Sequence, residues 1–191
     1  MKRIIIFASG KGTNTLNIIK YFKKNKKVEV THVFSNKLES NVLKKSIKQG
    51  VKALHFDRES LYDSNEVLHI VKDAAPDLIV LAGFLWKFPE NIIAEYTDRI
   101  INIHPALLPD YGGKGMYGMH VHNAVVKNKE AFSGITIHYV NENYDEGATI
   151  FQTKTPLLES DTAKDVAQKV HELEHEYFPS VIEYLLNNLK S

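Results

Sequence analysis

Apolar segments typical of strands alternate with amphipathic segments typical of helices through the first hundred residues of this chain. Strands are expected at residues 3–8, 28–34, 52–56, 78–81 and 100–103, and helices at residues 16–22, 41–49, 64–74 and 89–96. Strands separated by helices form a mostly parallel, twisted sheet with helices on both faces. The alternation therefore predicts an α/β fold.

The pattern changes after about residue 130. Residues 134–140 and 149–155 are expected to form two strands joined by a polar loop. A long closing helix is expected from Thr162 to about Asn188, with Asp161 or Ser160 as its N-cap. Because 191 residues are the size of one domain, we expect a single domain spanning residues 1–191.

The composition argues against several classes of partner. Lys and Arg total 24 against 23 acids, so a net charge of +1 gives no general attraction to nucleic acid or to an anionic membrane. The chain has no cysteine, hence no disulfide and no thiolate zinc site. Its longest apolar run, residues 78–84, is too short to span a membrane, and its start is too short for a signal peptide. We expect a cytoplasmic protein.

Two polar side chains end an apolar strand at residues 100–103. Alternate residues of a strand point to the same face, so Asn102 and His104 project together. Pro105 holds His104 extended, and Pro109 stiffens the loop that follows. Ligands of open α/β sheets bind at the carboxyl ends of strands, and this pair is therefore a candidate site. We also predict that the Leu108–Pro109 bond is cis, because two prolines bracket a sharp turn.

Asp145 is the candidate partner of His104. It lies in a polar turn between the two late strands, where an Asp often bonds only its own backbone. A catalytic histidine, however, needs a carboxylate that orients it and stabilises its charged form.

A glycine loop follows the first strand, with the sequence Gly10-Lys11-Gly12-Thr13-Asn14. A strand that enters a helix through two glycines exposes the first backbone N–H groups of that helix, which can bind phosphate. The alternative is a tight turn in which Thr13 caps the helix.

Two histidine patterns resemble metal sites. His120 and His122 alternate, as two ligands on a strand or loop would, but no third ligand has a fixed spacing. His171-Glu172-Leu173-Glu174-His175 matches HExxH, yet an apolar stripe runs through the same helix. A zinc site also needs a third ligand, and the only acids after His175 are Glu176 and Glu183. We expect no metal.

These motifs together resemble the phosphoribosylglycinamide formyltransferases, a family within the formyltransferase superfamily. The resemblance covers essentially the whole chain and rests on SGKGTN (9–14), VFSNK (33–37), PDLIVLAGF (76–84), INIHPALLP (101–109), IHYV (137–140), DEG (145–147) and EH (174–175).

The resemblance implies a role for each matched residue. It implies catalysis by Asn102, His104 and Asp145, and nucleotide binding by Gly12, Thr13, Asn14 and Glu174. It implies folate binding by Leu85, Trp86, Lys87 and Phe88, together with Asn102. The N-terminal half, to about residue 100, would then bind the nucleotide, and the C-terminal half would carry the catalytic and folate-binding elements.

The implied reaction moves the formyl group of 10-formyltetrahydrofolate, a co-substrate, to the amine of 5-phosphoribosylglycinamide in purine biosynthesis. Asn102 would donate a hydrogen bond to the formyl oxygen. His104, made more basic by Asp145, could donate to the same oxygen or shuttle the amine proton. A formyltetrahydrofolate hydrolase and a non-catalytic binder are the alternatives. Only small-molecule partners are expected, for a monomer or a homodimer.

This chain departs from the family pattern in three places. Residues 112–119 form a longer, glycine-richer segment, in which Lys114 could contact the phosphate. His171 stands where some members carry glutamine, and Arg58 is only an uncertain counterpart of the arginine near the folate tail.

Overall fold

Seven strands form one sheet in a computed structural model that describes residues 1–189. They are β1 (Lys2–Phe7), β2 (Val28–Ser35), β3 (Lys52–His55), β4 (Leu78–Leu81), β5 (Ile100–His104), β6 (Phe132–Tyr139) and β7 (Thr149–Pro156). Their order across the sheet is β3-β2-β1-β4-β5-β6-β7. The first five pair in parallel, whereas β6 and β7 each pair antiparallel to the strand before them. The mostly parallel α/β sheet predicted from the sequence is confirmed.

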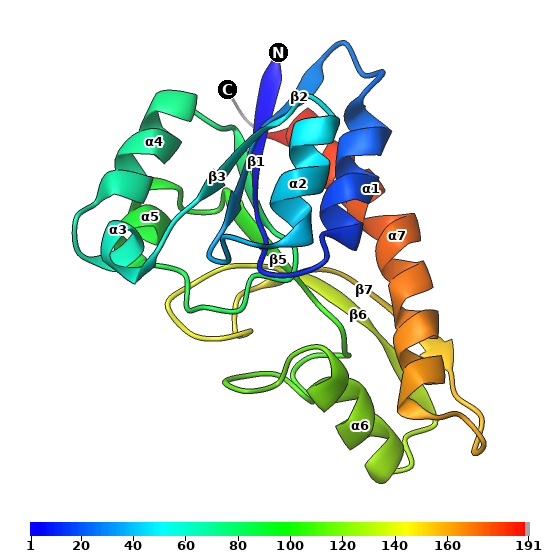
Figure 1. Ribbon diagram of the computed structural model, residues 1–191. Helices are drawn as coiled ribbons and strands as arrows, with labels where there is room; N and C mark the ends of the chain where they lie inside the picture. Colours follow the sequence, from blue (N-terminus) through cyan, green and yellow to red (C-terminus); the bar gives the residue numbers. More distant parts are fainter. Residues whose placement is uncertain (190–191) are drawn as a thin grey trace.

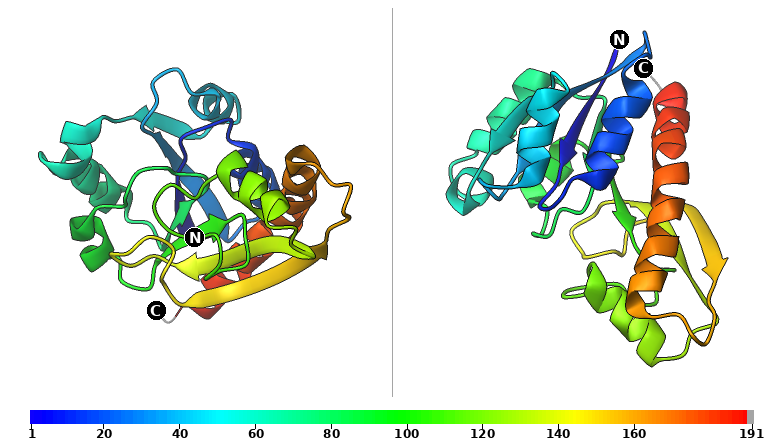
Figure 2. Two further views of the ribbon diagram at one scale, coloured as in Figure 1. Left: turned by 90° about the horizontal axis from the view of Figure 1, so that it is seen from below. Right: turned by 45° about the vertical axis from the view of Figure 1, so that its right-hand side comes forward.

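Helices cover both faces of this sheet. They are α1 (Thr13–Phe22), α2 (Asn41–Lys48), α3 (Arg58–Tyr62), α4 (Glu66–Ala74), α5 (Glu90–Glu95), α6 (Met119–Lys127) and α7 (Ala163–Asn188). Figure 1 shows α3, α4 and α5 on one side and α1, α2 and α7 on the other, and Figure 2 shows α7 running along the molecule. Among residues 1–189, no helix is long and apolar enough to cross a membrane.

Strand β1 is apolar at each of its last four positions, residues 4–7, and the packing explains why. Ile4 and Ile6 pack into the core under α1, α2 and α7, whereas Ile5 and Phe7 pack into the core under α3, α4 and α5. Because a central parallel strand is buried on both faces, it needs an apolar side chain at each position rather than at alternate ones.

Two helices were not predicted from the sequence. Helix α3 has only five residues and begins with a capping box, in which Asp57 accepts from the Ser60 backbone N–H. Helix α6 follows the glycine-rich segment directly and buries Val121, His122 and Val125.

The predicted N-cap of the last helix was wrong. Thr162 is the N-cap of α7, and its side chain accepts from the Asp165 backbone N–H. The preceding Asp161 instead forms an ion pair with Lys169. The predicted cis bond between Leu108 and Pro109 is confirmed.

The strand order positions the site. The chain moves outward from β1 through β2 to β3, then returns to place β4 on the other side of β1. The loops that leave β1 and β4 therefore diverge at the carboxyl edge of the sheet, and ligands bind in the crevice that forms there.

Candidate active site

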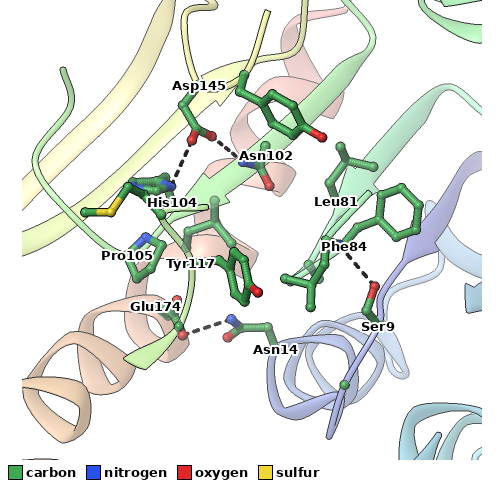
Figure 3. Close-up of a pocket in the computed structure, with 18 of the residues that line it drawn as sticks. Ser9, Asn14, Leu81, Phe84, Asn102, His104, Pro105, Tyr117, Asp145 and Glu174 are labelled. Carbon is green, nitrogen blue, oxygen red and sulfur yellow. Dashed lines mark hydrogen bonds and ion pairs between the residues drawn. The ribbon is translucent and has the colours of Figure 1, made fainter. Parts of the chain in front are cut away.

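A cavity of about 1000 Å³ opens at the carboxyl ends of β1, β4 and β5 (Figure 3). Its walls come from the loops after these strands, residues 113–119, the loop between β6 and β7, and the first half of α7. Ligand sites span about 300 to 1,000 Å³. A cavity at the upper end of this range has room for two substrates side by side.

The structure brings Asn102, His104 and Asp145 together at this cavity. Strand β5 carries Asn102 and His104, and the loop between β6 and β7 carries Asp145 (Figure 3). His104 Nδ1 lies 3.4 Å from Asp145 Oδ2, and Asn102 Nδ2 donates to Asp145 Oδ1 over 3.4 Å. The two carboxylate oxygens thus face the two other members of the trio.

Backbone geometry and a backbone donor fix the Asp145 carboxylate. Asp145 has φ +58°, a left-handed conformation that Asp adopts more readily than most residues. The Gly113 N–H donates to its Oδ2 over 2.9 Å. Burial raises the pKa of Asp145, but the neighbouring His138 and His104 rings and this N–H together hold it below its usual value. Asp145 is therefore an anion at neutral pH.

His104 is 3 % exposed, and its Nε2 lies 2.7 Å from the Tyr111 carbonyl oxygen. A carbonyl only accepts, so Nε2 carries the proton, and in the neutral ring Nδ1 holds a lone pair against Asp145. Burial lowers the pKa of His104, although the Asp145 carboxylate raises it. Asp145 does make His104 more basic, as expected. Burial has the larger effect on this pKa, however, so the net shift is downward.

His138 adjoins the trio without a role having been assigned to it from the sequence. It is buried on β6 directly opposite Asn102. Its Nε2 lies 3.2 Å from Asn102 Nδ2 and 3.5 Å from Asp145 Oδ1. The two antiparallel strands produce this contact, and the register of their pairing was not evident from the residue order.

The glycine loop has the geometry expected of an anion site. Gly12 is the N-cap of α1 with φ +72°, and it makes no side-chain cap hydrogen bond. Thr13 is the first helical residue and does not cap the helix, contrary to the alternative reading of the loop. A Cβ atom on Gly12 would lie 2.4 Å from Val42 Cγ2, so both backbone angle and space require glycine. The first backbone N–H groups of α1 have no partner within the helix, and the residues that carry them line the cavity.

Glu174 lies on α7 beside this loop (Figure 3). Asn14 Nδ2 donates to Glu174 Oε2 over 2.9 Å, and His171 Nδ1 lies 3.1 Å from the same oxygen. This contact with Glu174 raises the pKa of His171. The predicted nucleotide-binding residues therefore meet at one end of the cavity, although they come from opposite ends of the sequence.

The predicted folate segment forms another wall of the cavity, after β4. The Leu85 N–H donates to Ser9 Oγ over 3.1 Å, and the Lys87 carbonyl accepts from Tyr62 Oη over 2.7 Å. These two bonds hold the backbone of the segment. Leu85 and Lys87 are exposed, Trp86 is half-buried, and Phe88 is buried in the core against α3, α4 and α5.

Arg58 and Lys114, two basic residues named above where the chain departs from the family pattern, both lie near the cavity. The Arg58 guanidinium lies 4.7 Å from the centre of the Trp86 ring, next to the folate segment. Lys114 lines the cavity from the glycine-rich segment.

The two metal-like patterns do not form ligand sets. Residues 119–127 are helical, so His120 and His122 are not alternate residues of a strand or loop, and they diverge: His120 is exposed and His122 is buried. In the HExxH pattern, the rings of His171 and His175 lie 4.0 Å apart, but His171 Nδ1 is engaged by Glu174 over 3.1 Å. Within residues 1–189 there is no group of three His, Cys, Asp or Glu side chains that could hold a metal ion.

The sequence and the fold match known proteins of one kind. The chain matches the Formyl transferase family over residues 2–182. It is 35 % identical to phosphoribosylglycinamide formyltransferase of Escherichia coli over 95 % of this chain and 85 % of the relative. It is also 31 % identical to that of Bacillus subtilis, over 97 % and 95 %. A chloroplastic relative from Vigna unguiculata is longer: at 35 % identity, the match covers 96 % of this chain but 61 % of the relative.

Solved structures agree with these matches. The crystal structure of phosphoribosylglycinamide formyltransferase from Bacillus halodurans superposes with a TM-score of 0.88 at 31 % identity, covering 99 % of this chain and 97 % of that one. The corresponding structure from Brucella melitensis gives 0.86 at 32 % identity, covering 100 % and 98 %. This chain belongs to the formyl transferase family and, within it, to the phosphoribosylglycinamide formyltransferases.

Proposed function

We propose that this chain transfers the formyl group of 10-formyltetrahydrofolate to the amine of 5-phosphoribosylglycinamide, and that Asn102, His104 and Asp145 catalyse the transfer. One observation carries the proposal. The trio, with His104 buried and Asn102 and Asp145 half-buried, lies in the same cavity as a phosphate-type glycine loop, a carboxylate at Glu174 and the loop after β4. A site of this kind can hold an anionic nucleotide and a second, flatter ligand on either side of one acid–base group.

In this proposal the nucleotide occupies the end of the cavity that is lined by the glycine loop and the start of α1. Its phosphate accepts hydrogen bonds from the backbone at Gly12, Thr13 and Asn14, where the helix dipole favours negative charge. Its ribose hydroxyls donate to Glu174. The glycinamide amine then extends toward His104.

The folate binds along Leu85, Trp86, Lys87 and Phe88, with its formyl group directed to Asn102. Backbone groups suit this recognition because two hydrogen bonds already fix the segment. In this arrangement the first hundred residues supply most nucleotide contacts, and the rest of the chain supplies the catalytic residues and Glu174.

The charge state of His104 indicates its part in the reaction. Because burial lowers its pKa, His104 is mainly neutral at neutral pH and has a lone pair on Nδ1. The amine attacks the formyl carbon, and Nδ1 accepts the proton that the amine releases. The resulting imidazolium lies against Asp145, which stabilises it, and the proton passes on to the leaving folate nitrogen.

Asn102 stabilises the charge that develops on the formyl oxygen. In the free protein its Nδ2 contacts both His138 and Asp145, and the 3.4 Å contact with Asp145 is the longer of the two. The formyl oxygen approaches the hydrogen on that side, which Asp145 holds only over 3.4 Å, as the tetrahedral intermediate forms. A single donor of this kind typically contributes about 2.7–4 kcal/mol to the transition state.

An assay with 10-formyltetrahydrofolate, run with and without the nucleotide amine, tests this function. A transferase releases tetrahydrofolate only when the amine is present and yields the N-formyl nucleotide. Release of formate without the amine would instead identify a hydrolase, and binding without turnover would identify a non-catalytic binder. His104→Ala serves as the matched control, since it retains both binding segments.

The proposal places the protein in the cytoplasm, since a chain without cysteine suits a reducing compartment. It requires no metal, and its partners are the two small substrates.

A further inference from the structure

His138 lies beside Asn102 and Asp145 in the wall of the cavity. It lies on β6 directly opposite Asn102, and it is 2 % exposed. Neighbouring side chains on paired antiparallel strands lie within contact distance. His138 therefore acts on Asn102 directly, and both side chains line the cavity.

Its backbone contact determines which ring nitrogen carries the proton. His138 Nδ1 lies 2.8 Å from the Tyr139 carbonyl oxygen, which can only accept. The proton is thus on Nδ1, and in the neutral ring Nε2 presents a lone pair. That lone pair lies 3.2 Å from Asn102 Nδ2.

This tautomer orients the Asn102 amide. An amide oxygen at the position of Nδ2 would face two acceptors, the His138 lone pair and the Asp145 carboxylate, and both contacts would be repulsive. With the NH₂ group in that place, one hydrogen bonds His138 Nε2 and the other bonds Asp145 Oδ1. Figure 3 shows the amide nitrogen turned to Asp145 and the oxygen turned away.

We propose that His138 is a positioning residue that holds the Asn102 amide in the orientation needed to donate to the formyl oxygen. The inference rests on the function proposed above, in which Asn102 is that donor. His138 keeps one hydrogen of the NH₂ group engaged, and the formyl oxygen approaches the other hydrogen in place of Asp145 Oδ1. The amide plane therefore stays fixed as charge develops.

A double-mutant cycle tests this role. His138→Leu removes the acceptor but keeps an apolar side chain in the core, and we expect it to lower kcat by about tenfold or more. The roughly 10²–10³-fold loss that follows removal of an oxyanion donor sets the upper bound. Because His138 acts through Asn102, the same change in an Asn102→Ala background should cost nothing further in kcat. An equal fractional loss in both backgrounds would overturn the proposal.

A conservative variant separates orientation from packing. His138→Gln places an amide oxygen near the position of Nε2, where it can accept from Asn102, so we expect it to recover part of the kcat lost in His138→Leu. Equal kcat in the two folded variants would contradict the proposed role. Thermal unfolding of each variant shows whether it is folded, and if His138→Leu does not fold, the cycle is run with His138→Phe, which also lacks the acceptor.

A readout without turnover separates this proposal from the function itself. The side-chain NH₂ resonances of Asn102, assigned by their loss in Asn102→Ala, should move in His138→Leu and stay close to wild type in His138→Gln. Unchanged resonances in His138→Leu would exclude the orienting contact even in an active enzyme. Absence of formyl transfer in the wild type would instead count against the proposed function. The Asn102 resonances would still show whether His138 orients the amide.

Discussion

Asn14 Nδ2 donates a 2.9 Å hydrogen bond to Glu174 Oε2, which joins the first turn of α1 to the middle of α7 across 160 residues of sequence. His171 Nδ1 contacts the same carboxylate oxygen over 3.1 Å. Two partners therefore hold Oε2, and a substrate hydroxyl is expected at the other oxygen, Oε1.

Glu174→Gln should weaken nucleotide binding without affecting folate binding. A hydrogen bond to a charged group contributes about 1.5–3 kcal/mol, so we expect the KM for the nucleotide to rise by about 10- to 100-fold. Steady-state kinetics with each substrate varied in turn measure this, and Glu172→Gln on the same helix is the matched control. An equal rise in both KM values would show a general defect.

The same substitution should change the titration of His171. Its contact with Glu174 raises the pKa of His171, so removal of the charge should bring that pKa back toward the ordinary value. A histidine whose pKa rises on folding adds stability that is full below its unfolded pKa and is lost as the pH rises through its folded pKa. NMR titration of the His171 ring in wild type and Glu174→Gln measures the change. A pKa that stays raised in the variant would rule out Glu174 as the cause.

Asp145→Asn should move the acid limb of the pH–rate profile. The reaction needs neutral His104, and its lowered pKa places this limb below pH 6.5. The Asp145 carboxylate raises the pKa of His104, so its removal lets that pKa fall further and shifts the limb to lower pH. We also expect kcat to fall by about 10²–10⁴-fold, because the imidazolium loses its counter-charge. A limb that moves to higher pH would contradict the assignment.

Gly12→Ala should damage both stability and nucleotide binding. The left-handed backbone costs a residue with a Cβ about 1–2 kcal/mol, and the new atom would lie 2.4 Å from Val42 Cγ2. We expect a lower unfolding temperature and a higher KM for the nucleotide. Gly10→Ala is the matched control in the same loop, because a Cβ there meets no heavy atom within 4 Å. Equal effects of the two substitutions would show that neither the angle nor the space at Gly12 matters.

The sheet could be predicted because it depends on local patterns. Runs such as residues 78–81 are apolar at every position and lie between amphipathic segments, which is sufficient to predict buried parallel strands. Alternation within β5 likewise places Asn102 and His104 on one face without further information.

The missed elements depended on choices that the local sequence leaves open. His120 and His122 looked like alternating ligands, but Val121 and Val125 lie one helical turn apart and pack α6 into the core. At the start of α7, Ser160, Asp161 and Thr162 are all suitable caps. Thr162 is the one whose side chain reaches the N–H three residues on, and the residue there, Asp165, returns the bond.

The site could be predicted only in part, for a similar reason. Asp145 and Glu174 lie far from His104 in sequence. The need of a catalytic histidine for a carboxylate indicated Asp145, whereas only the resemblance to a family indicated Glu174. The contact of His138 with Asn102 follows from the register of β5 and β6, and these strands are joined by residues 105–131 rather than by a tight turn that would fix the register.

The bond between Asn14 and Glu174 also sets when the protein becomes competent during its synthesis. A ribosome makes the glycine loop before it makes α7, and domains fold as their segments emerge. Until α7 has left the ribosome and packed against α1, the phosphate loop has no carboxylate opposite it. Incomplete chains that end before this helix should therefore neither retain the nucleotide nor compete with finished protein for it.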